Sequence, residues 1–412
     1  MRAAYPTEST KGVLEWNREE GPMTSNENAA EPETTTTSET SETTETAEPT
    51  ATEASPAAPS RRFRDGPHLP ALVVTLIVTV VAGLFAGTYA WAMGDPQPHD
   101  VPIGLVSTTH TPAELATELQ ARTGTSFVVR PYNREADAEA AIREQVVYGA
   151  LVEEPDGSVR FYVSSASGAS VARLLEADAP RLEQSIGRPV TVIDAHPLGA
   201  KDPNGLVLFY VALAAVVIGF VGAIQTRVNA AKLTLAGELL WDVVRSVLGG
   251  FAIAFTVGPL LGVLPIPFFP VWGVLALTML IAGATYSFWR VLIGGRWAML
   301  PTWIVFVLIS NPSSGGAVAP ELLPPFYQFM GRWLPTGATV RAVRDLTYFP
   351  GNLHLEPYIV LVVWLVASVG LFVAVRLFRY GPGAPGDILH TWRSMARRPA
   401  HAEGAAGAEA AA

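Results

Sequence analysis

Long apolar stretches dominate the hydrophobic and polar pattern of this 412-residue chain. A bilayer core of about 30 Å needs about 20 apolar helical residues, and six stretches meet or approach that length. They cover residues 71–93, 206–224, 247–264, 271–287, 297–311 and 358–377. The fifth is short because it fades at Asn311-Pro312. The pattern predicts a membrane all-α bundle of six transmembrane helices, with helix 1 at residues 69–94 and the other five within residues 204–380.

Basic residues in the short flanks of these stretches predict the orientation, because cytoplasmic loops carry an excess of Lys and Arg. Three lie on one side of the bundle, and thirteen lie on the other: Arg61, Arg62, Arg64, Arg227, Lys232, Arg245, Arg290, Arg296, Arg376, Arg379, Arg393, Arg397 and Arg398. We therefore expect a multi-pass protein of a bacterial plasma membrane with both termini in the cytoplasm, and Arg376 is expected to snorkel to the membrane surface. A cleaved signal peptide is the alternative for the first stretch, which exceeds the usual apolar core of about 7–15 residues.

Residues 1–68 are expected to form an acidic cytoplasmic tail, and residues 381–412 a second cytoplasmic tail. The first 60 residues hold 12 Glu and 3 basic residues, a balance of −9 that equals the net charge of the whole chain. Residues 24–60 are a low-complexity run of Thr, Ser, Glu, Ala and Pro, which predicts disorder. Met23 directly precedes this run and is an alternative start of translation.

Composition excludes several classes of protein. There is no Cys, which removes disulfides, thiol nucleophiles and Cys-based metal sites. The chain after residue 60 is electrically neutral, so no basic surplus attracts nucleic acid. No G-x-x-x-x-G-K-[ST] loop is present, and His99, His110 and His196 do not stand at metal-ligand spacing. We therefore expect no enzyme, no cofactor and no metal, and any ATP hydrolysis belongs to a partner subunit.

Residues 95–203, between the first two spans, alternate between strand and helix patterns and predict an inserted extracytoplasmic α/β domain. Strands are predicted at 103–106, 127–130, 148–153, 159–164 and 190–194, and helices from 111, at 134–145 and at 169–186. Thr111 to Glu114 form a capping box, Pro155-Asp156-Gly157 predicts a hairpin turn, and Gly187 ends the third helix. The run 164–168 before that helix either caps it or offers its N–H groups to an anion.

The predicted spans carry no ionisable residue at their centres, which argues against a proton-coupled pump. Gly83 and Gly87 form a G-x-x-x-G pair, suited to packing within the bundle or to a dimer face. Between the second and third spans, residues 225–245 alternate apolar and charged positions, which predicts an amphipathic helix on the membrane surface or in a partner's groove. Residues 311–350 mix breakers with aromatics, which predicts two short helices dipping into the outer leaflet as a re-entrant hairpin.

One span, an external α/β domain and five further spans resemble the ABC-2-type permeases, especially the phage-infection-protein (YhgE/Pip-like) branch, with similarity to nitrosoguanidine-resistance-type proteins. The hairpin residues that carry the resemblance are Asn311, Pro312, Gly315, Gly316, Pro320, Pro324, Pro325, Pro335 and Arg344. The resemblance implies that this hairpin forms part of an exit gate. It also implies that residues 225–245 are a coupling helix for an ATP-binding subunit, with Glu238, Asp242 and Arg245 as its polar contacts.

Two functions follow as expectations. The first is the transmembrane subunit of an exporter of lipophilic or amphipathic compounds, a homodimer or heterodimer energised by a separate ATPase and surrounded by membrane lipids. The second is a non-transporting membrane anchor whose external domain binds a cell-envelope, secretion or phage partner. An intramembrane enzyme is disfavoured because the spans hold no paired carboxylates, histidines or nucleophile.

Overall fold

The computed structural model describes residues 68–94, 96, 98–107, 111, 113, 114, 117, 120, 121 and 126–381. Both predicted tails lie outside these residues except for their inner edges at His68 and Gly381. The predicted disorder, the alternative start at Met23 and the basic residues before the first span therefore also lie outside them. The described chain is mostly helical and carries a small α/β sheet domain.

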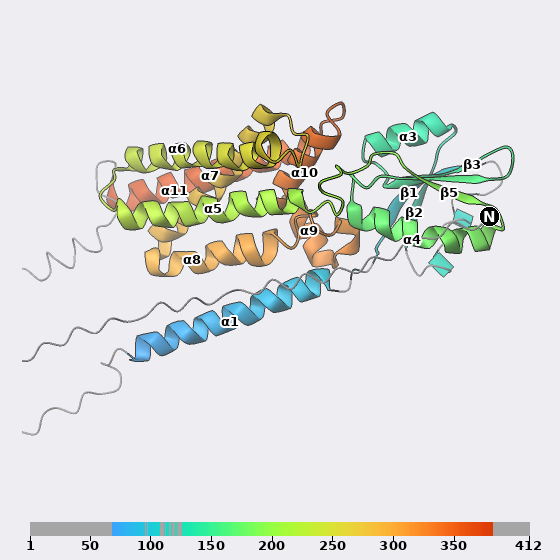
Figure 1. Ribbon diagram of the computed structural model, residues 1–412. Helices are drawn as coiled ribbons and strands as arrows, with labels where there is room; N and C mark the ends of the chain where they lie inside the picture. The colour runs from blue at the N-terminus through green and yellow to red at the C-terminus, as the bar shows by residue number, and fades with distance from the viewer. Residues whose placement is uncertain are drawn as a thin grey trace, which may run out of the picture. The chain divides into compact units, whose positions relative to one another are not determined.

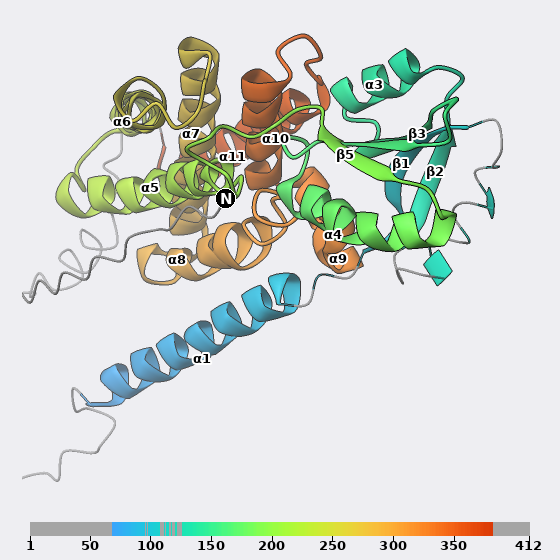
Figure 2. The same cartoon turned by 45° about the vertical axis from the view of Figure 1, so that its right-hand side comes forward.

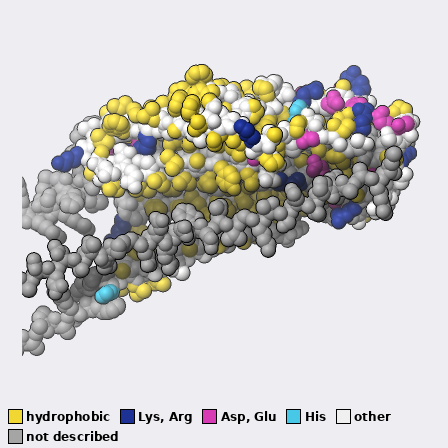
Figure 3. Space-filling model, in the orientation of Figure 1, with side chains coloured by type: hydrophobic (Ala, Val, Ile, Leu, Met, Phe, Trp, Pro, Cys, Tyr) yellow, Lys and Arg dark blue, Asp and Glu magenta, His cyan; other side chains and the backbone are white. Residues whose placement is uncertain are grey.

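Five helices of the described residues are long and apolar enough to cross a membrane. They are α1 (His68–Met93), α5 (Val207–Asn229), α6 (Leu235–Phe255), α7 (Phe268–Ile293) and α11 (Glu356–Tyr380). A π-helical turn, η2 (Thr256–Leu260), extends α6. Hydrophobic side chains cover the visible face of the helical part, whereas charged side chains gather over the α/β domain (Figure 3). These features identify a membrane protein.

The remaining predicted span is shorter. It comprises the nine residues of α8 (Gly295–Trp303) and the seven of the π-helix η3 (Ile304–Ser310). At 1.5 Å per residue these residues extend about 24 Å, less than the bilayer core. Pro301 lies inside α8, shortly before the π-helix η3 begins. Because proline has no backbone N–H, it interrupts the helical hydrogen bonds there. Five of the six predicted spans are thus seen as long apolar helices, and the sixth crossing stays a prediction.

Helix α7 forms the centre of the bundle, where it packs against α5, α6, α10 (Pro335–Tyr348) and α11 (Figure 1). Its residues Leu275, Met279 and Ile281 are fully buried. Glycine lets α5 approach it closely, because a Cβ at Gly219 would lie 2.6 Å from the Met279 carbonyl oxygen. In contrast, Gly83 of α1 meets open space among the described residues. Bundle packing therefore accounts for the glycine in α5, and the role of the G-x-x-x-G pair stays a prediction.

The α/β domain is built on a five-stranded mixed sheet of order β2-β1-β3-β4-β5. The strands are β1 (Val101–Val106), β2 (Phe127–Pro131), β3 (Gly149–Glu153), β4 (Val159–Val163) and β5 (Val190–Asp194). Strand β1 runs parallel to β2 and β3, β4 runs antiparallel to β3, and β5 runs parallel to β4. The predicted hairpin turn joins β3 to β4, with Gly157 at φ 90°. The predicted strands are confirmed, with ends that shift by at most two residues.

Two helices cover opposite faces of this sheet (Figure 2). Side chains alternate between the faces of a strand, so Ala150 and Val152 of β3 pack under α3 (Glu135–Arg143). Leu151, between them, packs under α4 (Ala169–Ile186). The predicted end of α4 is confirmed, because Gly187 adopts the left-handed conformation at φ 67°.

Two local predictions in this domain have different outcomes. The capping box is confirmed, because the Glu114 N–H donates to Thr111 Oγ1 (3.3 Å) and the Thr111 N–H donates to Glu114 Oε2 (3.0 Å). No side chain of the run 164–168 caps α4, whose N-cap Gly168 has no side-chain cap hydrogen bond, and anion binding by this run stays a prediction. Ser165 instead donates to the Asp194 carboxylate at 2.5 Å, and that negative charge repels an anion.

Residues 311–350 contain the 3-10 helix η4 (Pro320–Leu322), α9 (Pro325–Trp333) and α10 (Pro335–Tyr348). Proline occupies the first turn of each, where its missing N–H costs no hydrogen bond. Helix α10 is buried along most of its length. Helix α9 instead exposes Phe329 and Trp333. The two short helices therefore differ: one belongs to the protein interior, and the other presents aromatic residues outward.

Candidate functional site

Three regions are candidates for function: a buried charge network, a polar chamber and an apolar groove. The charge network joins α5, α6 and α7 through Arg227, Glu238, Asp242, Arg245 and Arg290. Asp242 lies four positions after Glu238, which places both carboxylates on one face of α6. That face turns into the bundle, and both residues are 1% exposed.

Each carboxylate of the network contacts more than one guanidinium. Asp242 lies 2.8 Å from Arg227 Nη2 and 3.0 Å from Arg245 Nη2. Glu238 lies 3.1 Å from Arg290 Nη2 and 3.9 Å from Arg227 Nη2. Burying an ion is unfavourable unless opposite charges surround it, and this arrangement supplies them. The three guanidiniums and two carboxylates therefore act as one unit that links three helices.

This geometry corrects the prediction for residues 225–245. They do not form a separate surface helix: residues 225–229 end α5, residues 230–234 are a short connection, and α6 begins at Leu235. Thr234 caps α6 by accepting from the Gly237 N–H at 3.3 Å. Glu238 and Asp242 were expected to contact a partner, but their burial prevents this in the structure described. The alternation of acidic and apolar residues had indicated that the acidic residues face water. In the structure, Glu238 and Asp242 instead pair with arginines inside the bundle.

Glycines on the two neighbouring helices leave room for the side chain of Arg245. A Cβ at Gly222 of α5 would lie 2.4 Å from Arg245 Cδ, and one at Gly283 of α7 would lie 2.8 Å from its Nη2. Arg376 near the end of α11 is also fully buried, so the expectation that it snorkels is wrong. Its guanidinium lies 5.0 Å from the centre of the Tyr380 ring, in range of a cation–π interaction.

The hairpin residues occupy the opposite end of the bundle. Asn311 is buried, and its Nδ2 donates to the Tyr89 hydroxyl of α1 at 2.6 Å. Pro312 and Gly315 are buried beside it, and Gly315 has φ 72°. A Cβ at Gly316 would lie 3.0 Å from the backbone of Phe209 in α5.

The other predicted hairpin residues lie at helix starts or face the α/β domain. Pro320, Pro325 and Pro335 begin η4, α9 and α10, and Pro324 precedes α9. Leu322 and Ala319 belong to the same hydrophobic cluster as α4. The hairpin therefore packs into the core of the α/β domain.

A polar chamber of about 220 Å³ lies between the hairpin and the α/β domain. Its lining includes Tyr148, Glu321, Arg341, Arg344 and Asp345. The Tyr148 hydroxyl donates to Glu321 Oε2 at 2.5 Å. Burial, reinforced by the Glu321 carboxylate, raises the pKa of Tyr148 well above its usual value. Tyr148 therefore remains a neutral donor across the physiological range.

Further groups link the two sides of the chamber. Gln145, just after α3, donates to Asp345 Oδ1 at 2.7 Å. The His354 ring and backbone N–H contact the other oxygen of Asp345 at 3.1 and 3.2 Å. Burial lowers the pKa of Arg341, although Glu356 opposes that shift. The chamber thus carries both signs of charge on fixed side chains.

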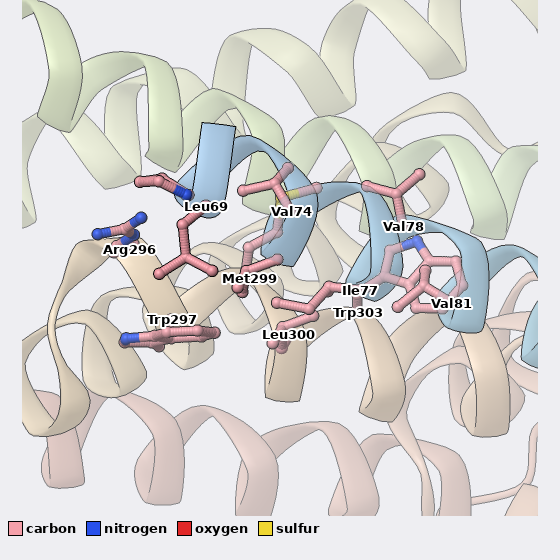
Figure 4. A pocket seen from close by; sticks show the side chains of 12 residues that line it. Leu69, Val74, Ile77, Val78, Val81, Arg296, Trp297, Met299, Leu300 and Trp303 are labelled. Carbon is pink, nitrogen blue, oxygen red and sulfur yellow. The ribbon is translucent and has the colours of Figure 1, made fainter. Parts of the chain in front are cut away.

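The apolar groove, of about 490 Å³, lies between α1 and α8 (Figure 4). Side chains such as Val74 and Val78 of α1 face Met299 and Trp303 across it. At one end Arg296 lies near Leu69, and among the described residues of the lining it is the one that carries a charge. Among the described residues, the ring contacts and side-chain hydrogen bonds between α1 and other elements come from its second half, through residues such as Phe85, Tyr89 and Trp91. The first half therefore stands apart from the bundle.

Several functional residues were missed by sequence reasoning. Arg227 and Arg290 were counted only as orientation signals, although the spacing of Glu238 and Asp242 pointed to one shared face. Gln145 and His354 gave no signal, because their partner Asp345 lies far away in the sequence. Within the described residues, no three His, Asp or Glu residues are grouped to hold a metal ion.

No known family model and no curated protein matches this chain.

Proposed function

We propose that this chain is the membrane-spanning subunit of an exporter of lipophilic or amphipathic compounds, working as a homodimer or heterodimer with a separate ATPase. The observation that carries the proposal is the groove between α1 and α8. It is apolar along most of its lining and has Arg296 at one end. An amphipathic molecule pairs an apolar body with a polar head, and this lining matches that division.

The short helix beside the groove supports the same proposal. The α8–η3 segment extends about 24 Å, and a helix shorter than the hydrocarbon core thins the bilayer around it. A thinned bilayer next to an apolar groove lowers the cost of moving a lipophilic molecule along the protein.

The charge network offers a means of coupling to a partner. The sequence contains no P-loop, so energy from ATP must arrive through another subunit. The exposed Lys232 lies in the short connection between α5 and α6, close along the chain to both Arg227 and Glu238. A partner that binds this connection and moves it would displace the charge network and, through Arg290, helix α7.

The anchor hypothesis is the weaker alternative. It treats the α/β domain as a separate binding module, yet Ala319 and Leu322 of the hairpin complete that domain's hydrophobic core. A deletion of residues 97–200 would uncover both residues. The α/β domain and the hairpin are therefore better described as one structural unit of the membrane protein.

Purification from native membranes tests the proposal. A tagged chain, isolated in mild detergent, is expected to carry an ATP-binding subunit identifiable by mass spectrometry and to hydrolyse ATP. Lys232→Glu is expected to weaken that association, whereas Arg173→Glu on the exposed face of α4 serves as the matched control and leaves it intact. Isolation of the chain with envelope proteins and without any ATPase would favour the anchor instead.

A further inference from the structure

The polar chamber beneath the α/β domain contains a buried cation without a counter-charge. Arg344 is 8% exposed and lines the chamber. Its Nη2 donates to the Gly315 carbonyl oxygen at 2.8 Å, and its Nε is buried with no hydrogen-bond partner in the described part of the chain. Among the described residues, no carboxylate oxygen lies within 4.0 Å of a guanidinium nitrogen of Arg344, the limit for an ion pair.

The carboxylates of the chamber wall are engaged elsewhere. Asp345 accepts hydrogen bonds from Gln145 and His354. Glu356 lies 3.3 Å from Arg332 and 3.7 Å from Arg341.

The third carboxylate of the wall, Glu321, accepts from the Tyr148 hydroxyl. Each of the three carboxylates thus has a hydrogen-bond donor or cation of its own. None of them neutralises the charge of Arg344.

A second donor faces the same space. Arg341 lies three residues before Arg344 on α10, so the two share a helix face. Its terminal nitrogens donate to the carbonyl oxygens of Gly331 and Arg332 at 3.0 and 2.9 Å. Its Nε, like that of Arg344, is buried without a hydrogen-bond partner in the residues that the structure describes. Both arginines line the chamber, and each keeps one N–H group without an acceptor among the described residues.

From these observations we propose that the chamber binds an oxyanion, a phosphate or carboxylate group, on Arg344 and Arg341. A buried guanidinium without a counter-charge is costly, and an oxyanion supplies the missing charge together with further acceptors. Guanidinium groups match the geometry of carboxylates and phosphates. The volume of about 220 Å³ is below the usual range for a drug-sized ligand, which fits a head group or a small anion. The inference does not depend on the proposed export function.

The test uses the full chain in nanodiscs of phosphatidylcholine, in chloride buffer without phosphate. Inorganic phosphate or acetate is added, and the thermal unfolding midpoint is followed. A ligand that binds only the folded state raises this midpoint, and above its Kd the rise grows with the logarithm of the ligand concentration. Wild-type protein and Arg134→Gln, an exposed arginine of the α/β domain, are expected to respond equally. Arg344→Gln is expected to lose the response, and an unchanged response in that variant overturns the proposal.

A measurement on wild-type protein covers the case in which Arg344→Gln does not fold. Phenylglyoxal modifies arginine, and mass spectrometry gives the rate at each site. At about ten times its Kd, a bound anion is expected to slow modification of Arg344 about tenfold and to leave Arg134 unaffected.

A third arm distinguishes the two sources of the oxyanion. Protection in phosphatidylglycerol nanodiscs without added anion identifies a lipid head group. Protection in phosphatidylcholine only after addition of phosphate or acetate identifies a soluble ligand. Equal rates at Arg344 under all of these conditions overturn the proposal.

Discussion

Buried charges are compensated differently at the two ends of the helical bundle. In the network of α5, α6 and α7, Asp242 contacts both Arg227 and Arg245, so each ion has an opposite neighbour. In the chamber, the partner that the described residues offer Arg344 is a carbonyl oxygen, that of Gly315. The first arrangement favours a fixed connection between helices. The second leaves binding capacity for a molecule from outside the chain.

The network predicts an asymmetry between two substitutions. Asp242→Asn removes the carboxylate that Arg227 and Arg245 share and leaves Arg227 with the more distant Glu238, at 3.9 Å. The loss of stability is expected to be about 3–5 kcal/mol. Arg227→Met is expected to cost less, because Asp242 keeps Arg245 at 3.0 Å. Unfolding of the detergent-solubilised protein by denaturant measures both, with the exposed Arg134→Gln as a control of little effect. An equal or larger loss for Arg227→Met would contradict the proposed arrangement.

His196 predicts a dependence of stability on pH. Burial and the nearby Arg143 lower its pKa, although Asp194 opposes the shift. The unfolded chain therefore binds a proton more readily than the native protein, and stability falls as pH drops below about 6.5, the usual value for His. The His196 ring also packs edge-on against Phe349, with centroids 5.2 Å apart. The effect is measured by thermal unfolding of wild type and His196→Phe between about pH 7.5 and about pH 5, values that bracket that pKa. The unfolding midpoint is expected to change less with pH in the variant than in wild type. An identical dependence on pH in the two proteins would refute the assignment to His196.

At the scale of elements, missing side chains decide how closely helices approach. Gly331 of α9 faces the turn that follows η3, and a Cβ there would lie 1.8 Å from the Ser313 carbonyl oxygen. Gly219 plays the corresponding part between α5 and α7. The hairpin is therefore held by backbone contact as well as by the side chains of its aromatic residues.

Gly331→Ala provides a direct test of this contact. Helix propensity alone predicts that alanine stabilises α9 by about 1 kcal/mol. The clash with Ser313 reverses the sign, and a loss of about 1–3 kcal/mol is expected. Gly351→Ala is the matched control, since a Cβ at that glycine meets nothing within 4 Å. Thermal unfolding of the two variants decides between propensity and contact, and a stabilised Gly331→Ala would show that the close approach is absent.

Elements with local signals could be predicted from the sequence. Strand β5 and helix α4 have the predicted ends, because β-branched alternation and Gly187 are read within a few residues. The start of α6 could not be predicted in this way. Its carboxylates resemble a solvent-facing pattern, and only the position of Arg227 and Arg290 on neighbouring helices reveals burial. The chamber was equally hidden, because its walls come from segments that are about 200 residues apart, such as Gln145 and Asp345.

At the scale of the whole molecule, helix ends sort into two groups. Helix α1 leads into β1 and α5 follows β5, so those ends adjoin the α/β domain (Figure 1). Lys201 donates to the Leu261 carbonyl oxygen at 2.7 Å, which places the α6–α7 connection there too. At the other ends, Arg379 of α11 donates to the Val291 carbonyl oxygen of α7 at 2.7 Å. This alternation is the one expected of a chain that crosses a membrane repeatedly.

Our proposals depend on that alternation corresponding to two sides of a membrane. The chain lacks Cys, so single-cysteine variants give a clean background for a membrane-impermeant maleimide. Asp156→Cys, in the turn of the α/β domain, and Gly351→Cys, after α10, are expected to react in whole cells. Lys232→Cys and Arg296→Cys are expected to react only after the cells are opened. Labelling of Lys232→Cys in intact cells, or protection of Asp156→Cys, would contradict the arrangement on which the exporter proposal rests.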